Sequence, residues 1–324
     1  MVFGDTFKED EDFGRSAPFF HLFHTMKKIL TLILFFLIAF NAIHANITYN
    51  LSDDGTLTIS GTDMPNYSYS EVPWYSQKDK IKKIIIKNGV TNIGGYAFEY
   101  CSGLTSITIP NSVMSIGEYA FDNCSGLTSV NIPNSVMSIG KGAFCSCYGL
   151  ISVIIPNSVT SIGEGVFHSC KNLTSVTIPN SVTSIKEETF EGCSGLKSVI
   201  IPNSVTSIEN EVFKSCSSLK SITCEANTPP SFLLENESQV FYNVDRSIPV
   251  YVPANSVDQY KAADEWKEFT NIQAIPDVNT LIDEKSFNAN PSSGLVYDLN
   301  GKVINDNTPK FGIYIRNGKK VVIK

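Results

Sequence analysis

A 23-residue unit repeats without insertion through residues 81–224, and this period constrains the fold more than any other feature of the chain. Phe recurs at one point of every unit, and Cys follows three residues later each time. These positions are Phe98, Phe121, Phe144, Phe167, Phe190 and Phe213, followed by Cys101, Cys124, Cys147, Cys170, Cys193 and Cys216. A fixed period of this length is typical of a solenoid, in which each coil buries its apolar face against the next.

Each unit begins with a short apolar alternation, as in residues 104–109, which predicts a strand with one buried face. Pro110 ends that strand, because proline has no N–H for a ladder and favours a turn. Val113 and Ile116 are then expected to point inward, and residues 117–121 return the chain across the opposite side. Stacked coils place equivalent residues about 4.8 Å apart. We therefore expect buried columns of Phe and Cys beside one parallel sheet.

The repeated unit Leu-x-x-Ile-x-Ile-Pro-Asn-Ser-Val-x-x-Ile-Gly-x-x-Ala-Phe-x-x-Cys resembles the BspA-like, or Treponema pallidum-type, leucine-rich repeat. That family is found on surface proteins of anaerobic bacteria and some mucosal protists. The resemblance is dense over residues 81–224 and implies a leucine-rich-repeat solenoid that is secreted or displayed on the cell surface. It also implies protein binding, or adhesion to host matrix or to neighbouring cells.

The start of the chain has the pattern of a secretory signal peptide. A basic Met26-Lys27-Lys28 precedes an apolar run, and the small residue Ala45 follows it. We expect residues 26–45 to be the signal, with cleavage after Ala45, and residues 1–25 to be an upstream segment from a mis-assigned start. The alternative is an uncleaved anchor helix. With cleavage, no transmembrane helix is expected in the mature chain.

Both ends of the repeat region carry patterns that predict caps, and the family has similar sequences at both places. In residues 46–80, two alternating runs joined at Gly55 predict a β-hairpin. In residues 225–275, a strand over residues 248–253 is followed by a predicted helix over residues 256–269. Ser256 is its expected N-cap, and the side chains expected to be buried are Val257, Tyr260, Ala263 and Trp266.

The remainder is predicted to be a polar linker at residues 276–291 and a small β module at residues 292–324. Two strand pairs are expected in the module, turning at Asn300-Gly301 and at Asn317-Gly318. The module resembles the C-terminal sorting domain of cargo for the Bacteroidetes type IX secretion system, which implies an extracellular destination. The alternative is a terminal module that only adds stability.

Composition argues against nucleic-acid binding and catalysis. The formal net charge is −7, and the chain has only three arginines, so no basic surface for phosphates is expected. After signal cleavage His168 is the only histidine, which argues against Ser-His-Asp or Cys-His catalysis and against multi-histidine metal sites. It occupies a column that we expect to be solvated. We therefore predict no enzyme activity, no cofactor and no metal site.

The eight cysteines call for a separate interpretation, because an exported chain usually forms disulfides. Six of them share one inward column, and Cys224 occupies an inward Ile position of the strand. Neighbours in such a column point the same way, which disfavours disulfide geometry. These seven are predicted to be buried free thiols. Cys145 is the exception, and either a reactive thiol or a pair with Cys147 remains open.

The strand residues that alternate with the buried Ile are expected to form one flat, hydroxyl-rich outer strip. Between residues 81 and 224 there are nine Lys and nine Asp plus Glu, so no strong field is expected there. We interpret the strip as the face for an extracellular protein partner, although Ser and Thr also suit a merely solvated sheet. Its residues are Ser106, Thr108, Ser129, Asn131, Ser152, Ile154, Ser175, Thr177, Ser198, Ile200, Ser221 and Thr223.

Two alternatives to a protein-binding face remain at this level. The aromatic residues Tyr67, Tyr69, Trp74 and Tyr75 either pack onto the first coil or form a platform for an extracellular glycan. The second alternative is that the protein is a passive spacer on the cell surface.

Overall fold

The computed structural model describes residues 47–68, 70–233 and 239–276, together with the backbone of three strands between residues 296 and 323. The expected upstream segment and signal peptide lie outside these residues. The chain divides into two compact units, Met1–Ala274 and Ile275–Lys324. Among the described residues, no helix has the length and apolar character needed to cross a membrane.

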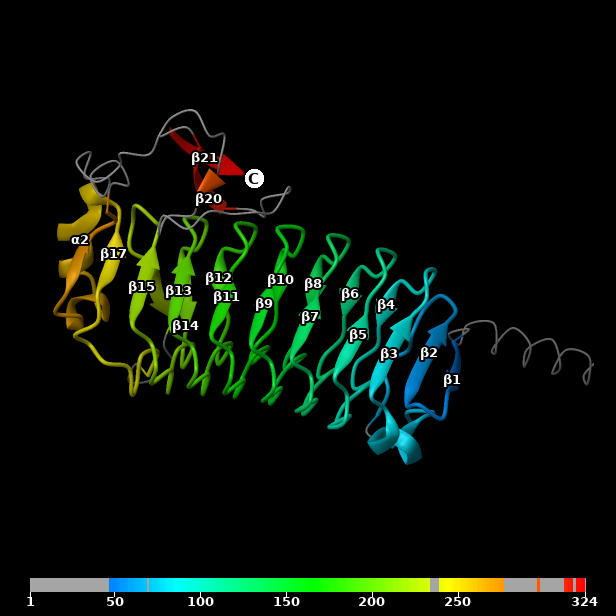
Figure 1. The fold of residues 1–324 in the computed structure, drawn as a ribbon. Helices are drawn as coiled ribbons and strands as arrows, with labels where there is room; N and C mark the ends of the chain where they lie inside the picture. The colour runs from blue at the N-terminus through cyan, green and yellow to red at the C-terminus, as the bar shows by residue number, and fades with distance from the viewer. Residues whose placement is uncertain are drawn as a thin grey trace, which may run out of the picture. The chain divides into compact units, whose positions relative to one another are not determined.

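The first unit is a solenoid whose coils stack side by side, as Figure 1 shows from β2 to β17. The predicted strands form a first row that is parallel throughout. Within the repeats, paired residues lie one repeat apart in the chain, such as Ser152 and Ser175. The row consists of two hydrogen-bonded sheets, and the boundary between them lies between β5 and β7. The row consists of β2 (Thr56–Ser60), β3 (Lys83–Ile86), β5 (Ser106–Thr108), β7 (Ser129–Asn131), β9 (Ser152–Ile154), β11 (Ser175–Thr177), β13 (Ser198–Ile201), β15 (Ser221–Cys224), β17 (Val250–Val252) and β18 (Ile272–Ala274).

The structure adds a second row of very short parallel strands, where the sequence predicts only one sheet. The strands from β6 to β14 each begin at the Ser that precedes the second inward Ile of a unit. Their paired residues lie one repeat apart, as for Ser115 and Ser138. The row consists of β4 (Asn92–Ile93), β6 (Ser115–Ile116), β8 (Ser138–Ile139), β10 (Ser161–Ile162), β12 (Ser184–Ile185), β14 (Ser207–Glu209) and β16 (Ser231–Leu233). The core therefore lies between two ladders.

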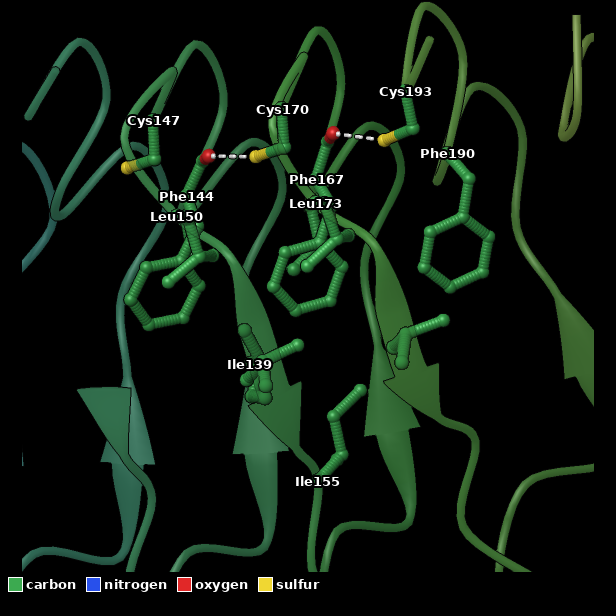
Figure 2. Close-up of a cluster of buried hydrophobic side chains, with 14 of the residues drawn as sticks. Ile139, Phe144, Cys147, Leu150, Ile155, Phe167, Cys170, Leu173, Phe190 and Cys193 are labelled. Atoms are coloured by element: carbon green, nitrogen blue, oxygen red, sulfur yellow. Dashed lines mark hydrogen bonds between the residues drawn. The ribbon is translucent and has the colours of Figure 1, made fainter. Parts of the chain in front are cut away.

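The predicted Phe column is confirmed and continues at both ends. All six Phe rings are at most 1% exposed, and neighbouring rings stack with centroids 5.2–5.8 Å apart. Figure 2 shows three of these rings, Phe144, Phe167 and Phe190, in one line. Trp74 stacks on the first ring at 5.5 Å, and Phe241 stacks on the last at 5.5 Å. The caps therefore extend the aromatic column of the coils.

The six cysteines of the repeat form the second predicted buried column. Each thiol from the second coil onward donates to a Phe carbonyl of the preceding coil, at 3.1–3.2 Å. Figure 2 shows two of these bonds, from Cys170 and Cys193. Cys224 is also buried and accepts a hydrogen bond from the hydroxyl of Tyr260. Thiols thus satisfy backbone carbonyls inside an apolar core.

A column of glycines controls how closely the coils approach on the second row. A Cβ built on Gly163 would lie 2.5 Å from the backbone nitrogen of Lys141, so only glycine fits there. The next coil has Lys186 at this position. There β10 and β12 belong to separate ladders, and a small cavity opens that both Ile162 and Lys186 line. The break is confined to this step, because the following coil has Glu209 at the same position and β12 still pairs with β14.

The N-terminal cap is the predicted hairpin. β1 (Thr48–Leu51) pairs antiparallel with β2, and β2 continues parallel into β3, so the hairpin covers the first coil. A short 3₁₀ helix, η1 (Tyr75–Lys80), then leads into the repeats. The hairpin fills the open end of the solenoid, as terminal repeats require.

The C-terminal cap has the predicted strand, but the expected helix over residues 256–269 is wrong in extent. Helix α2 covers only Val257–Ala262, because Ala263 is extended and Glu265 has a φ of 63°. Short 3₁₀ turns, η2 (Ala254–Ser256) and η3 (Trp266–Glu268), flank it.

Its polar and aromatic side chains bind loop carbonyls of the cap. The Ser256 hydroxyl donates to the Asn227 carbonyl at 2.7 Å and does not cap the helix. The Trp266 indole donates to the Pro230 carbonyl at 3.1 Å. Tyr260 and Trp266 are buried as predicted, and Val257 and Ala263 are partly buried. Burial of two large rings therefore determines this segment more than helix propensity does.

In the second unit, β20 (Gly312–Arg316) and β21 (Lys319–Ile323) form an antiparallel hairpin. Arg316 pairs with Lys319, as the predicted two-residue turn at Asn317-Gly318 requires. β19 (Val296–Tyr297) pairs with β20. The expected turn at Asn300-Gly301 and the linker after Pro276 lie outside the described residues.

Candidate interaction surface

The outer strip lies on the first row of strands, where period-2 alternation turns every second side chain away from the core. Ten of its twelve residues are exposed, and Ser221 and Thr223 are half-buried beside the C-terminal cap. The register aligns them in two straight lines, with Ser129 opposite Ser152 and Asn131 opposite Ile154. The inward residues between them are buried at six of the seven strands that carry the pattern from β3 to β15, and only Ile107 is half-exposed.

Two isoleucines interrupt the hydroxyl-rich surface. Ile154 is 72% exposed and Ile200 is 53% exposed, and both pair with Thr177 from opposite sides. No charged residue belongs to the strip. The face can therefore offer apolar area and hydroxyl hydrogen bonds to a partner, whereas it cannot attract one by charge over a distance.

Of the four aromatic residues proposed as a glycan platform, the three that the structure describes do not form an open ring surface. Trp74 is 1% exposed, stacks on Phe98 and donates from its indole nitrogen to the Ala97 carbonyl at 2.8 Å. Tyr67 is half-buried with its ring edge against Trp74, and burial raises the pKa of its hydroxyl to about 12. Tyr75 is half-buried beneath the ammonium of Lys78. Tyr69 lies outside the described residues.

A further row of polar residues runs along the return segments, one position after each Phe. Its members are Glu99, Asp122, Cys145, His168, Glu191 and Lys214. The sequence suggests a solvated column, but Asp122 is buried and Cys145 is half-buried. Burial raises the pKa of the Asp122 carboxyl, and hydrogen bonds from Cys145 and Asn123 oppose that shift.

Cys145 is the thiol for which the sequence left two interpretations open. Burial raises its pKa to about 11, so little thiolate is present at neutral pH. Its sulfur lies 3.6 Å from the Ser146 hydroxyl, while the Cys147 thiol donates to the Phe121 carbonyl. The geometry therefore favours neither a reactive thiol nor a pair with Cys147.

His168, for which the sequence predicts a solvated position, is half-buried beside two carboxylates. Its Nδ1 lies 3.4 Å from Oε2 of Glu188 and 3.7 Å from Oε2 of Glu191. The other oxygen of Glu191 lies 3.1 Å from Nζ of Lys214, which also lies 2.9 Å from Glu211. The repeat spacing could have identified Glu191 as the neighbour of His168, but Glu188 comes from another column.

Comparison with protein families gives one match. A model of the BspA type leucine rich repeat region, six copies long, matches residues 73–197 and residues 138–261. Together the two matches cover more than half of the chain. They extend beyond the repeats at residues 81–224 into both caps, in agreement with the aromatic column that joins caps and coils. No curated protein matches the chain.

Three solved structures are similar in fold. The T. pallidum leucine rich repeat protein is 26% identical over 53% of this chain and 87% of its own, with a TM-score of 0.44. A leucine-rich repeat protein from Bacteroides ovatus is 24% identical over 72% of this chain and 76% of its own, with a TM-score of 0.40. One from Eubacterium ventriosum is 22% identical over 71% and 83%, with a TM-score of 0.38.

Proposed function

Because the chain belongs to the BspA-type leucine-rich repeat family, we propose that it is an extracellular adhesin that binds a protein partner through the outer strip. The partner is a protein of the host matrix or of a neighbouring cell surface. The observation that carries the proposal is the strip itself, a regular exposed face without charges on a rigid double ladder. Such a face gains affinity from total area and shape.

Export would follow from the two ends of the chain. Residues 26–45 would act as a signal peptide cleaved after Ala45, and residues 292–324 would act as the sorting module for type IX secretion. The proposed domain boundaries are those that the sequence suggests, with a solenoid at 81–224 between caps at 46–80 and 225–275. N-terminal sequencing of exported protein tests the first point, because a start before Asn46 would show an uncleaved anchor.

The binding experiment uses immobilised protein and extracts of mucosal matrix. We expect Ser152→Lys with Ser175→Lys to abolish capture, because two ammonium groups at the centre of the strip must be desolvated against the partner. Ser161→Lys is the matched control, since Ser161 is an exposed strand serine on the second row. Equal capture by all variants would place the binding face elsewhere, and no capture by the unmodified protein would favour a passive spacer.

A glycan-binding module would need an exposed aromatic face, and Trp74 is buried. Catalysis has no support from the described side chains, since His168 contacts two carboxylates but no hydroxyl or thiol nucleophile within hydrogen-bond distance. The protein-binding hypothesis is therefore the one that the geometry supports best.

A further inference from the structure

The geometry points to a binding site for a divalent transition metal of the Zn²⁺ class, formed by His168, Glu188 and Glu191. His168 belongs to one coil and the two glutamates to the next, so the solenoid brings together side chains that are distant in the chain. Each of the three residues offers one potential ligand atom, and these three atoms all lie within 4.8 Å of one another. The site is separate from the outer strip and does not depend on the proposed adhesion.

The distances fit an ion better than direct hydrogen bonds. Charge-assisted N–H···O bonds are about 2.7–2.9 Å long, whereas Nδ1 of His168 lies 3.4 Å and 3.7 Å from the two carboxylate oxygens. Zn²⁺ binds nitrogen and oxygen at about 2.0–2.2 Å, and tetrahedral geometry then separates its ligands by about 3.4 Å. A small rotation of these side chains would therefore surround one ion.

Neighbouring groups already orient one of the carboxylates. Lys214 lies 3.1 Å from Oε1 of Glu191, which leaves Oε2 directed at His168. Glu211 lies 2.9 Å from the same ammonium and neutralises it. With neutral His168, the three glutamates and one lysine leave a net negative charge for a cation. Outer-shell hydrogen bonds of this kind hold metal-ligating carboxylates in place.

The cluster is also accessible. The side chains of His168 and Glu188 are 33% and 44% exposed, and that of Glu191 is 16% exposed. In the preceding coil the position equivalent to Glu188 is Gly165, where an added Cβ would meet nothing closer than His168 Cβ at 3.7 Å and Glu188 Oε2 at 3.9 Å. A Cβ at this position would be in van der Waals contact with both ligands, so the glycine keeps the space beside them free of a side chain.

The donor set selects the class of metal. Imidazole nitrogen favours Zn²⁺, Cu²⁺, Ni²⁺ and Fe²⁺, whereas Ca²⁺ and Mg²⁺ prefer oxygen alone. Three protein ligands leave at least one coordination position for water or for a carboxylate of another molecule. Cys145 lies one coil away from His168 in the same row and is the competing soft ligand. The experiment must therefore distinguish metal binding at His168 from metal binding at Cys145.

The test is calorimetric titration of the chelator-treated, thiol-reduced protein with Zn²⁺. We expect one equivalent to bind, and His168→Ala or Glu188→Gln to weaken binding at least about tenfold. Glu164→Gln and Cys145→Ser are the controls and should bind like the unmodified protein. Glu164 is a carboxylate of the coil that also carries His168, and it pairs with Lys141 instead. Circular dichroism verifies that each variant is folded.

A Co²⁺ spectrum gives an independent result. Visible d–d bands without a thiolate charge-transfer band are expected from nitrogen and oxygen ligands, and saturating Ca²⁺ should not remove them. No binding at one equivalent, undiminished binding by His168→Ala, or loss of binding in Cys145→Ser with a thiolate band in the unmodified protein would overturn the assignment. Displacement by Ca²⁺ would also contradict it.

Discussion

The thiol of Cys170 donates a hydrogen bond of 3.2 Å to the carbonyl of Phe144 in the preceding coil. The bond links the two buried columns, because it starts in the Cys column and ends on the backbone of the Phe column. The thiols of Cys124, Cys147, Cys193 and Cys216 make the equivalent bond to the Phe carbonyl of the preceding coil. Each coil is therefore attached to its neighbour by ring stacking, by backbone hydrogen bonds and by a thiol.

The first prediction concerns the Phe column. Phe167→Ala should lower the free energy of unfolding by about 3–5 kcal/mol, since it removes a fully buried ring and leaves a cavity between two stacked rings. Ser152→Ala on the outer strip should change it by less than about 0.5 kcal/mol. Urea unfolding followed by circular dichroism measures both, and similar losses for the two variants would contradict the stacked column.

The second prediction is that the protein loses stability in alkali because of its buried thiols. Burial raises the pKa of Cys101 and Cys216 to about 12, and those of Cys124, Cys147 and Cys193 well above the ordinary 9.0. A raised folded pKa means that the unfolded chain releases its protons first. Stability is therefore complete below pH 9 and falls above it, by about 1.4 kcal/mol per thiol at one unit above the unfolded pKa.

Urea unfolding at pH 8, 9 and 10 in the presence of a reductant measures this effect. Cys124→Ala should have a shallower dependence on pH than the unmodified protein, because one titrating group is gone. A free energy of unfolding that stays constant up to pH 10 would show that the thiols are not buried in the neutral form.

The third prediction concerns the glycine column. Gly163→Ala should destabilise the solenoid by about 1–3 kcal/mol, because its Cβ would lie 2.5 Å from the backbone of Lys141 and force the coils apart. Gly103→Ala, whose Cβ would meet its nearest atom at 3.3 Å, should stay within about 1 kcal/mol of the unmodified protein. Thermal unfolding compares the two, and a harmless Gly163→Ala would refute the steric limit on coil approach at this position.

The fourth prediction distinguishes a cap from a platform at Trp74. Trp74→Ala should cost about 3–5 kcal/mol, because the ring covers Phe98 at the end of the column. Trp74→Phe should keep the stacking and lose only the bond to the Ala97 carbonyl, at about 1 kcal/mol. If Trp74→Ala left the unfolding midpoint unchanged, the ring would not be part of the core.

The coils were predictable because their period has no insertions, so every inward position is seen six times. The Phe and Cys columns and the outer strip follow from that regularity. The caps could be predicted from the repeat only in part. Trp74 and Phe241 extend the column, but their intervals to Phe98 and Phe213 are longer than one repeat, so both lie outside its frame.

Other features depend on details that a pattern of apolar residues does not contain. The second row consists of pairs such as Ser115-Ile116, too short to show a period of two. The predicted helix over residues 256–269 has good amphipathic spacing, yet Tyr260 and Trp266 donate hydrogen bonds to two different loop carbonyls, those of Ala226 and Pro230. The contact of His168 with Glu188 depends on side-chain conformation across two columns.

The uniform spacing of the units has a consequence for how such a gene changes. An in-frame deletion of residues 144–166 would join Ala143 to Phe167, and the ring of Phe121 would then stack on that of Phe167. The solenoid would be one coil shorter, and both caps would be intact. In the polar row the same deletion would remove Cys145 and place Asp122 directly beside His168, so a change in length would also be a change in chemistry.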